Sequence, residues 1–246
     1  SILLLCCMVL TLLPTTVLAA DGPMDTIPKY DVSIDVYNRT SDISIKDSRS
    51  YYIYSSVPDK LRDTWAWDKK IFIKGDKTAP HVFIDGVNIK MSPSSKGPAI
   101  ELNKKASAYL YFIGRDSTLQ GADGRAAIQK NRSEGQLYVL ARTGTTVTCK
   151  GGYRAAGIGG SWAIRNIGDS MFNMDMYGHG VNMHFGSQSN PDYWGGTINA
   201  TGGEYGAGIG AGSWGHSGHS GNTIHGGAGE RLYFYSGTVN ASGGRL

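Results

Sequence analysis

The sequence predicts an all-β protein that folds as a right-handed parallel β-helix, a β-solenoid with coils of about 20–30 residues. Two observations support this fold class. A glycine-rich motif occurs at residues 146–162, recurs at residues 197–214, and begins a third time at Gly237. Apolar residues also recur in two series that advance together along the chain. Repetition at a period of tens of residues indicates stacked units that bury their apolar sides against one another.

The N-terminal segment has the features of a secretory signal. The first twenty residues carry no charge and are mostly apolar. Their apolar stretch is shorter than the roughly 20 residues of a membrane span. It ends in the small-residue pattern Val17-Leu18-Ala19. We therefore predict that residues 1–19 are a signal peptide with a truncated basic region, that no membrane span follows, and that the protein is secreted or associated with the cell surface.

Composition limits the chemistry of the mature chain. Cys149 is the one cysteine beyond the predicted signal peptide, so no internal disulfide is expected. It stands where the other motif copies have Ala200 and Ala241, which predicts a small buried apolar residue rather than a reactive thiol. The formal charge of +4 is spread along the chain without a run of Lys or Arg. We therefore expect no binding to nucleic acid.

The mature chain divides into two regions. Residues 20–66 are polar and irregular, and we expect them to form an N-terminal cap and first coil that protect the open end of the solenoid. Residues 67–246 are predicted to form the β-helix, which is truncated at its C-terminus within the third motif copy. Alternating apolar runs bounded by Gly, Asp, Asn or Ser predict strands at residues 70–73, 81–84, 108–113 and 136–140.

We interpret the two apolar series as ladders of inward side chains, one from each coil. The first comprises Ile89, Leu119, Val147, Ile198 and Val239, and the second comprises Ile100, Ile128, Ile158 and Ile209. Steps of 28 or 30 residues correspond to single coils, and the steps of 51 residues predict that one weakly matching coil lies in between. Residues 169–194 are predicted to be a divergent coil with a projecting loop.

The glycines are predicted to have two mechanical roles. Pairs such as Gly151-Gly152 follow an inward strand, where we expect a corner with positive φ. The glycines of the A-G-I-G segments are expected to let neighbouring coils approach closely. A phosphate-binding role is not expected, because these loops do not open helices and no Lys-Ser/Thr follows them.

Several segments resemble secreted right-handed parallel β-helix surface proteins of Gram-positive bacteria. These are the leader C-M-V-L-T-L-L-P-T-T-V-L-A-A, the segments V-F-I-D-G-V-N-I (82–89) and S-T-L-Q-G (117–121), and the G-T-[VI]-[TN]-A-x-G-G…A-G-I-G repeat. The resemblance covers about residues 70–246. It implies the β-helix fold, an envelope-associated location and carbohydrate-binding-like repeats. It transfers no catalytic residue.

Aromatic residues beside the repeated motif are the candidate binding residues. Trp162 and Trp214 close equivalent positions of the two motif copies, while Tyr153 and Tyr205 follow the corner glycines. Stacked coils are expected to place like residues in a row, where exposed rings bind the faces of sugars weakly and multivalently. The alternative is that the Trp rings cover a hydrophobic edge. An ice-binding face is not expected, because the threonines around Thr146 and Thr148 do not continue regularly.

Catalytic and metal-binding chemistry has less support. Gly178-His179-Gly180 matches a motif of β-helical pectin hydrolases, but the carboxylate motifs that accompany it there are missing. The best candidates for a Ca²⁺-dependent lyase are Arg115, Asp116, Asp123 and Arg125, whose alternative reading is solvated charge at coil corners. A zinc site would have to use His216, His219 and His225, which lie in a Gly/Ser-rich loop.

The sequence therefore favours a non-catalytic, monomeric module that binds a polysaccharide or a cell-envelope glycan, or that mediates adhesion. No cofactor is expected, and Ca²⁺ binding stays open. A structural surface stalk is the first alternative, and an acidic-polysaccharide lyase or hydrolase is the second.

Overall fold

The computed structural model describes residues 28–75, 78–92, 97–103, 105–130, 134–165, 178–216 and 224–245. For residues 163–165, 214–216 and 224–226 it describes the backbone alone. The predicted signal peptide lies outside these ranges. Within them the chain forms β-strands and one 3₁₀ turn, η1 (Asp59–Leu61), but no α-helix. Accordingly, no helix of the described ranges has the length and apolar character to cross a membrane.

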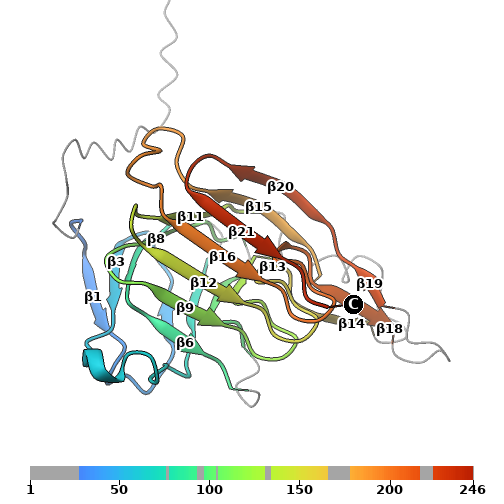
Figure 1. Ribbon diagram of the computed structural model, residues 1–246, viewed down its shortest axis with the longest axis horizontal. Helices are drawn as coiled ribbons and strands as arrows, with labels where there is room; N and C mark the ends of the chain where they lie inside the picture. The colour runs from blue at the N-terminus through green and yellow to red at the C-terminus, as the bar shows by residue number, and fades with distance from the viewer. Residues whose placement is uncertain are drawn as a thin grey trace, which may run out of the picture.

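Three large parallel sheets surround a common interior (Figure 1), and they account for most of the described strands. Sheet I contains β1 (Val32–Asp35), β3 (Ser50–Tyr54), β5 (His81–Asp85), β8 (Ala108–Phe112), β11 (Leu137–Ala141), β15 (Gly180–Phe185) and β20 (Gly229–Phe234). Sheet II contains β2 (Ile43–Ile45), β4 (Ile71–Lys74), β7 (Ile100–Asn103), β10 (Ile128–Gln129), β13 (Ile158–Gly159) and β17 (Ile209–Gly210). Sheet III contains β6 (Asn88–Lys90), β9 (Ser117–Gln120), β12 (Thr146–Lys150), β16 (Thr197–Thr201) and β21 (Thr238–Ser242).

The chain visits sheets I, III and II in a fixed order. Thus β8, β9 and β10 make one coil, and β11, β12 and β13 make the next. Between these two coils each strand pairs in parallel with the strand three places away in the sequence: β8 with β11, β9 with β12 and β10 with β13. The predicted all-β, right-handed β-helix is therefore confirmed. A smaller sheet of β14 (Ala163–Arg165), β18 (Ser213–His216) and β19 (Ile224–Gly226) lies beside the last coils.

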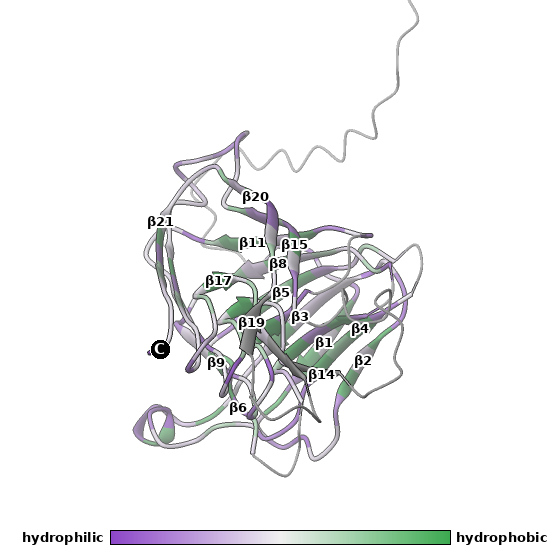
Figure 2. Ribbon diagram, turned by 90° about the vertical axis from the view of Figure 1, so that its right-hand side faces the viewer, coloured by the Kyte–Doolittle hydropathy of each residue, from purple (hydrophilic) through white to green (hydrophobic). Residues whose placement is uncertain are grey.

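The isoleucine ladder of sheet II is confirmed, and it is longer than predicted. Parallel pairing places six isoleucines in one column: Ile43, Ile71, Ile100, Ile128, Ile158 and Ile209. The first five are fully or almost fully buried, and the last packs partly exposed against the same core. Burying an isoleucine side chain contributes about 1.5–3 kcal/mol, so this column is a principal source of stability. Figure 2 shows apolar residues along the strands that enclose the interior.

The other predicted ladder is wrong at one step. Leu119 pairs with Cys149, whereas Val147 pairs with Ser117. Val147 and Cys149 are both buried and both point inward. A shift of two residues along a strand keeps a side chain on the same face, so the apolar pattern alone does not distinguish the two registers.

The predicted extra coil within the 51-residue step is also wrong. Ile158 pairs directly with Ile209, and Val147 pairs directly with Ile198. The added residues lie in the sequence between β13 and β15 and again between β15 and β16. The segment between β15 and β16 folds back over sheet I, where the ring of Trp194 lies 5.1 Å from that of Tyr111. Much of the predicted Met-rich coil lies outside the described residues.

The paired glycines are required for a reason other than the predicted one. Gly151 and Gly152 are not among the positive-φ residues. Instead, a Cβ on Gly152 would lie 1.9 Å from the carbonyl oxygen of Ala122 in the preceding coil, and a Cβ on Gly203 would lie 1.9 Å from that of Gly152. The missing side chains therefore let the backbones of neighbouring coils touch at this corner. The same close approach, which was predicted for A-G-I-G, is found at Gly159.

Candidate functional site

The candidate site lies at the corner where β12 leads into β13 and β16 leads into β17. Equivalent residues of three successive coils adopt positive φ there: Gly124 (73°), Arg154 (61°) and Tyr205 (60°). Their backbone N–H groups donate to the following coil, to the carbonyl oxygens of Tyr153, Glu204 and Arg245 at 2.9, 2.8 and 3.1 Å. Glycine is the favoured residue at positive φ, yet two of these coils have long side chains there.

Three aromatic rings surround the guanidinium group of Arg154. Its Cζ atom lies 4.9 Å from the ring centroid of Tyr153, 5.2 Å from that of Trp162 and 5.8 Å from that of Tyr205. Each distance is within the range of a cation–π interaction. The backbone N–H of Trp162 donates to the carbonyl oxygen of Gly124 at 2.9 Å, which fixes the indole over the corner of the previous coil. We call these four residues, Tyr153, Arg154, Trp162 and Tyr205, the Arg154 corner.

The Arg154 corner contains hydrogen-bond donors without acceptors. Nε of Arg154 and Nε1 of Trp162 are buried, and neither has a partner among the described residues. No hydrogen bond or ion pair joins the Arg154 guanidinium to a described side chain. Buried donors in proteins are nearly always paired, so such a cluster calls for a ligand or ordered water. The ring of Tyr153 is 39 % exposed and gives a ligand access from solvent.

The structure gathers three of the four predicted binding residues, but not by the predicted alignment. Trp214 pairs with Ala163, so Trp162 and Trp214 do not occupy equivalent positions. Tyr205 corresponds to Arg154 rather than to Tyr153, as the corner hydrogen bonds show. The side chain of Trp214 lies outside the described part of the structure. The sequence did not point to Arg154, the centre of the cluster, although Arg154 directly follows the candidate Tyr153 in the first motif copy.

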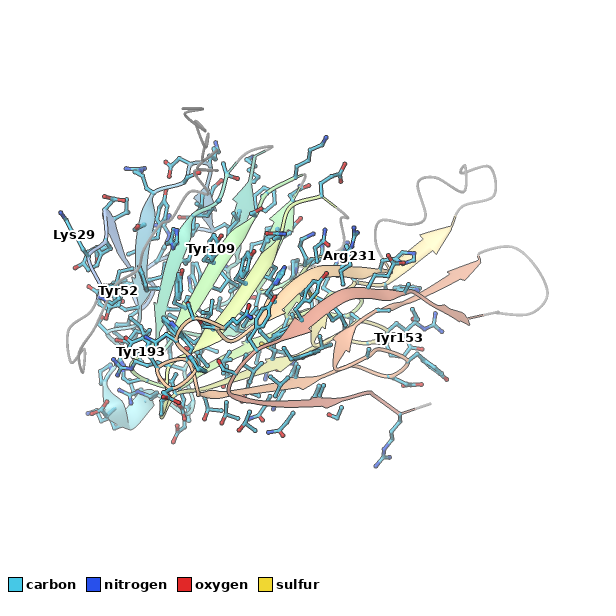
Figure 3. All side chains as sticks on the ribbon, turned by 90° about the horizontal axis from the view of Figure 1, so that it is seen from above. Lys29, Tyr52, Tyr109, Tyr153, Tyr193 and Arg231 are labelled. Carbon is cyan, nitrogen blue, oxygen red and sulfur yellow. The ribbon has the colours of Figure 1, made fainter. Side chains whose placement is uncertain are left out.

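A second aromatic surface runs along the outward face of sheet I. Five rings from successive coils stack in register: His81, Tyr109, Tyr138, His184 and Tyr233. Successive centroids are 4.7, 4.4, 4.4 and 4.7 Å apart, and successive planes are within 18° of parallel. We call this column the stacked ladder. Figure 3 shows Tyr109 well apart from Tyr153, so the stacked ladder and the Arg154 corner are separate.

The stacked ladder is poorly suited to binding sugar rings. Each inner ring has both faces covered by its neighbours and presents only its edge to solvent. Beside it, Tyr52, Phe83 and Tyr111 form a buried column. Tyr233, at the end of the ladder, is 43 % exposed. Cross-strand aromatic pairs stabilise sheets, and we assign the ladder that structural role.

Burial affects the protonation of the ladder. Desolvation lowers the pKa of His81 and of His184, so both imidazoles are neutral at pH 7. Nδ1 of His81 lies 2.9 Å from the hydroxyl of Tyr111, and Nδ1 of His184 lies 3.1 Å from that of Tyr235. Burial also raises the pKa of Tyr138 to about 12. His81, Tyr138 and His184 are therefore uncharged near neutral pH.

The outward face of sheet III is polar. Thr146, Thr197 and Thr238 form a regular column, contrary to the expectation that the threonines do not continue. In the adjacent column the Asn240 side-chain amide donates to Oδ1 of Asn199 at 2.8 Å. The two asparagines thus partner each other, and this face contributes no ring contact and no unpartnered buried donor among the described residues. It is therefore a weaker candidate than the Arg154 corner.

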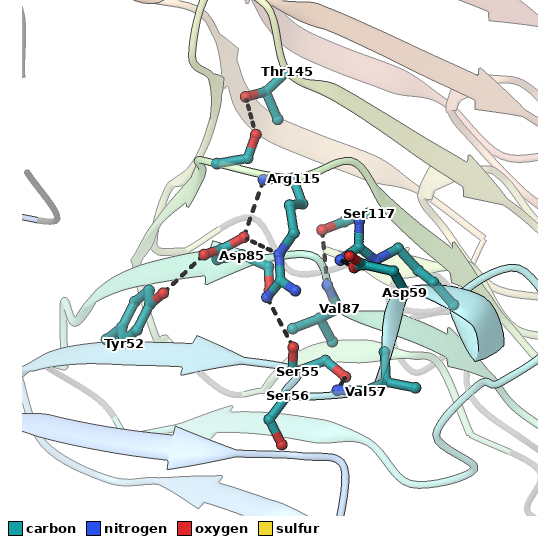
Figure 4. Close-up of polar contacts among 12 residues, drawn as sticks. Tyr52, Ser55, Ser56, Val57, Asp59, Asp85, Val87, Arg115, Ser117 and Thr145 are labelled. Atoms are coloured by element: carbon teal, nitrogen blue, oxygen red, sulfur yellow. Dashed lines mark hydrogen bonds and ion pairs between the residues drawn. The ribbon is translucent and has the colours of Figure 1, made fainter. Parts of the chain in front are cut away.

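Arg115 and Asp116, two of the charged residues considered for lyase chemistry, have structural partners. Asp85 accepts hydrogen bonds from the backbone N–H and Nε of Arg115, both at 3.0 Å, and from the Tyr52 hydroxyl at 2.8 Å (Figure 4). Arg115 also donates to the carbonyl oxygen of Ser55 at 2.8 Å, so the network joins three coils. Burial by itself raises the pKa of Asp85, but these hydrogen bonds and the nearby guanidinium outweigh it and lower that pKa.

Among the residues that the structure describes, the remaining candidates form no second site. Asp116 accepts a hydrogen bond from the backbone N–H of Thr146 at 2.7 Å, and Nδ1 of His179 accepts one from Ala228 at 3.0 Å. His219 and the side chains of His216 and His225 lie outside the described residues. Within the described ranges, no three His, Cys, Asp or Glu residues cluster as metal ligands would. Cys149 is fully buried, as predicted, and burial raises its pKa.

Comparison with known proteins finds no relative. No protein-family model matches the chain, and neither the curated proteins nor the solved structures include a match.

Proposed function

We propose that this protein is a secreted or cell-surface, non-catalytic β-helix module that binds a carbohydrate at the Arg154 corner. The observation that carries the proposal is the exposed ring of Tyr153 beside a guanidinium group that has no acidic partner in the described residues. An exposed ring supplies an apolar platform for the C–H face of a sugar. The adjacent donors supply hydrogen bonds to its oxygen atoms.

The solenoid supports this role by fixing the site. Arg154 and Tyr205 are held by backbone hydrogen bonds between coils, and Trp162 by its bond to Gly124. Binding groups that are already held in place lose little conformational entropy when the ligand arrives, so even a small contact area gives measurable affinity. We propose that the protein acts as a monomer in adhesion or in glycan capture. Its secretion is proposed from the predicted signal at residues 1–19, and N-terminal sequencing of the exported protein would test it.

A glycan array tests the proposal with the full chain and the variant Tyr153→Ala. Losing one ring–sugar contact of about 0.5–1.5 kcal/mol should weaken binding by roughly two- to tenfold. Tyr30→Ala is the matched control, because Tyr30 is 40 % exposed but lies in the first coil region, away from the corner. Equal binding by both variants, or binding of the full chain to no glycan, would refute the proposed site.

A structural stalk is the second candidate, and the stacked ladder is the observation that favours it. Five rings in continuous contact across successive coils stiffen one side of the solenoid. A stalk needs this rigidity but needs no ligand. Retention of the full chain on a glycan that depends on Tyr153 distinguishes a binding module from a simple spacer.

A further inference from the structure

We infer that the Arg154 corner selects sugars that bear a carboxylate, with uronic acids as the ligand class. This inference rests on the proposed function and adds the charge of its ligand. Two other partly buried cations have acidic partners: Arg115 pairs with Asp85 at 3.0 Å, and Lys70 pairs with Glu101 at 2.7 Å. Arg154 instead has three rings around it and no carboxylate among the described residues.

The surroundings of Arg154 strengthen its attraction for an anion. Aromatic rings exclude water from the faces of the guanidinium group, and a lower local dielectric increases the Coulomb energy with an incoming charge. The rings occupy the faces of the group but accept no in-plane hydrogen bond. Arg154 is half-buried and its Nε is covered, so its two Nη groups are the donors that an incoming acceptor can reach. The planar fork of a guanidinium group binds a carboxylate through two parallel, charge-assisted hydrogen bonds. A neutral sugar has no carboxylate and cannot form this pair.

The spacing of the groups favours a carboxylate that belongs to a sugar ring. The guanidinium carbon of Arg154 lies 4.9 Å from the ring centroid of the exposed Tyr153. A uronic acid presents its carboxylate beside the apolar C–H face of the same six-membered ring. One monosaccharide can therefore contact both residues, whereas a carboxylate on a flexible peptide side chain has no such face to place on Tyr153.

The backbone supplies an independent indication. Arg154 and Tyr205 have φ of 61° and 60° at a position where the preceding coil has Gly124. A residue other than glycine costs roughly 1–3 kcal/mol in such a conformation when it is held there, and strain of this kind is concentrated at functional sites. Both strained residues direct their side chains into the same cluster. The chain thus accepts strain at the two positions that build the Arg154 corner.

Binding of an oligogalacturonate to the full chain tests the inference, with three comparison probes: the same oligomer with its carboxylates reduced to alcohols, polyglutamate, and dextran sulfate. We expect the oligogalacturonate to bind at least tenfold more tightly than each of them. Arg154→Gln should weaken that binding about ten- to hundredfold, as expected for a lost charge-assisted pair. Lys150→Gln, which removes the same charge from the exposed end of β12, should leave it unchanged.

The outcomes separate this inference from the proposed function. Equal affinity for the acidic and the reduced oligomer, with Tyr153 still required, overturns the acidic class but leaves glycan binding intact. Stronger binding of polyglutamate or dextran sulfate also overturns it, because charge alone is then recognised. Binding to no glycan overturns both.

A second variant, Arg154→Gly, guards against a purely structural explanation. It places the favoured residue at a positive-φ position, as in Gly124 of the preceding coil. We expect an unfolding midpoint that is unchanged or higher, together with loss of oligogalacturonate binding. A lower unfolding midpoint with unchanged binding would show that Arg154 stabilises the fold and does not bind the ligand, and would overturn the inference.

Discussion

The imidazole of His184 lies on the phenol ring of Tyr138 with 4.4 Å between the ring centroids and 18° between the planes. This contact is the middle of the stacked ladder, and it joins two coils whose strands, β11 and β15, are separated by a long excursion of the chain. The rings of the stacked ladder therefore stay in register between β11 and β15, although these two strands are further apart in the sequence than β8 and β11.

Removing an inner ring of the ladder should destabilise the protein more than removing its last ring. Tyr138→Leu breaks the contacts with Tyr109 and with His184. We expect a loss of about 1–3 kcal/mol in the free energy of unfolding, from two contacts of about 0.5–1.5 kcal/mol each. Tyr233→Leu breaks one close contact, with His184, besides a longer one of 6.4 Å with Tyr235, and should cost about half as much. Urea denaturation followed by circular dichroism compares them, and equal losses would contradict a cooperative ladder.

Acidification should weaken the fold through the two ladder histidines. Burial lowers the folded-state pKa of His81 and of His184, so the unfolded chain binds protons first as the pH falls. Their contribution to stability is fully present above about pH 6.5, the unfolded value, and is lost as the pH falls from there towards the folded values. In the double variant with Phe at both positions, the free energy of unfolding should vary less between pH 7 and pH 5. An unchanged slope would exclude these imidazoles as its source.

Adding one methyl group at the glycine corner should destabilise the protein at Gly152 but leave its stability almost unchanged at Gly243. Gly152→Ala places Cβ 1.9 Å from the carbonyl oxygen of Ala122, and backbone atoms cannot yield as a flexible side chain does. We expect a loss of about 3 kcal/mol or more in the free energy of unfolding. Gly243→Ala places Cβ 3.5 Å from its nearest neighbour, so it should be neutral within about 1 kcal/mol. Thermal unfolding of both variants gives the comparison, and similar melting temperatures would argue against close backbone approach.

The network around Asp85 should contribute measurably to stability. Asp85→Asn removes the charge that Arg115 and Tyr52 are bonded to. We expect a loss of about 2–3 kcal/mol, below the range for fully buried pairs because the Arg115 side chain is 33 % exposed. Asp47→Asn is the control, since its pair with Arg49 is exposed and should be worth less than about 1 kcal/mol. Equal effects in chemical denaturation would show that the Asp85 network contributes no more than a surface pair.

The sequence predicts the coil but not every detail of its register. Ile100, Ile128 and Ile158 each follow Ala or Gly, and this shared context identifies them as one column. Val147 lacks such a context, because Cys149 two residues later is equally apolar and faces the same way. Periodicity thus determines which side of a strand is buried, whereas neighbouring inward positions are distinguished only by pairing.

The candidate site is harder to predict for a physical reason. The motif copies differ by one inserted residue, which moves Trp214 away from the position equivalent to Trp162. Arg154 adopts a conformation that sequence patterns assign to glycine. The stacked ladder, by contrast, leaves a signal, because Tyr109, Tyr138 and His81 are aromatic at outward positions of strands that the apolar pattern already predicts.

The direct pairing of Ile158 with Ile209 across 51 residues has a consequence for how such a chain can change. The packing of the interior depends on which residues pair between coils, and it does not depend on the number of residues that separate them in the sequence. Insertions between strands can therefore accumulate at the rim without altering any core contact. A chain of this kind can vary what it displays to its surroundings, by evolution or by engineered loop grafting, while its interior keeps the same sequence of layers.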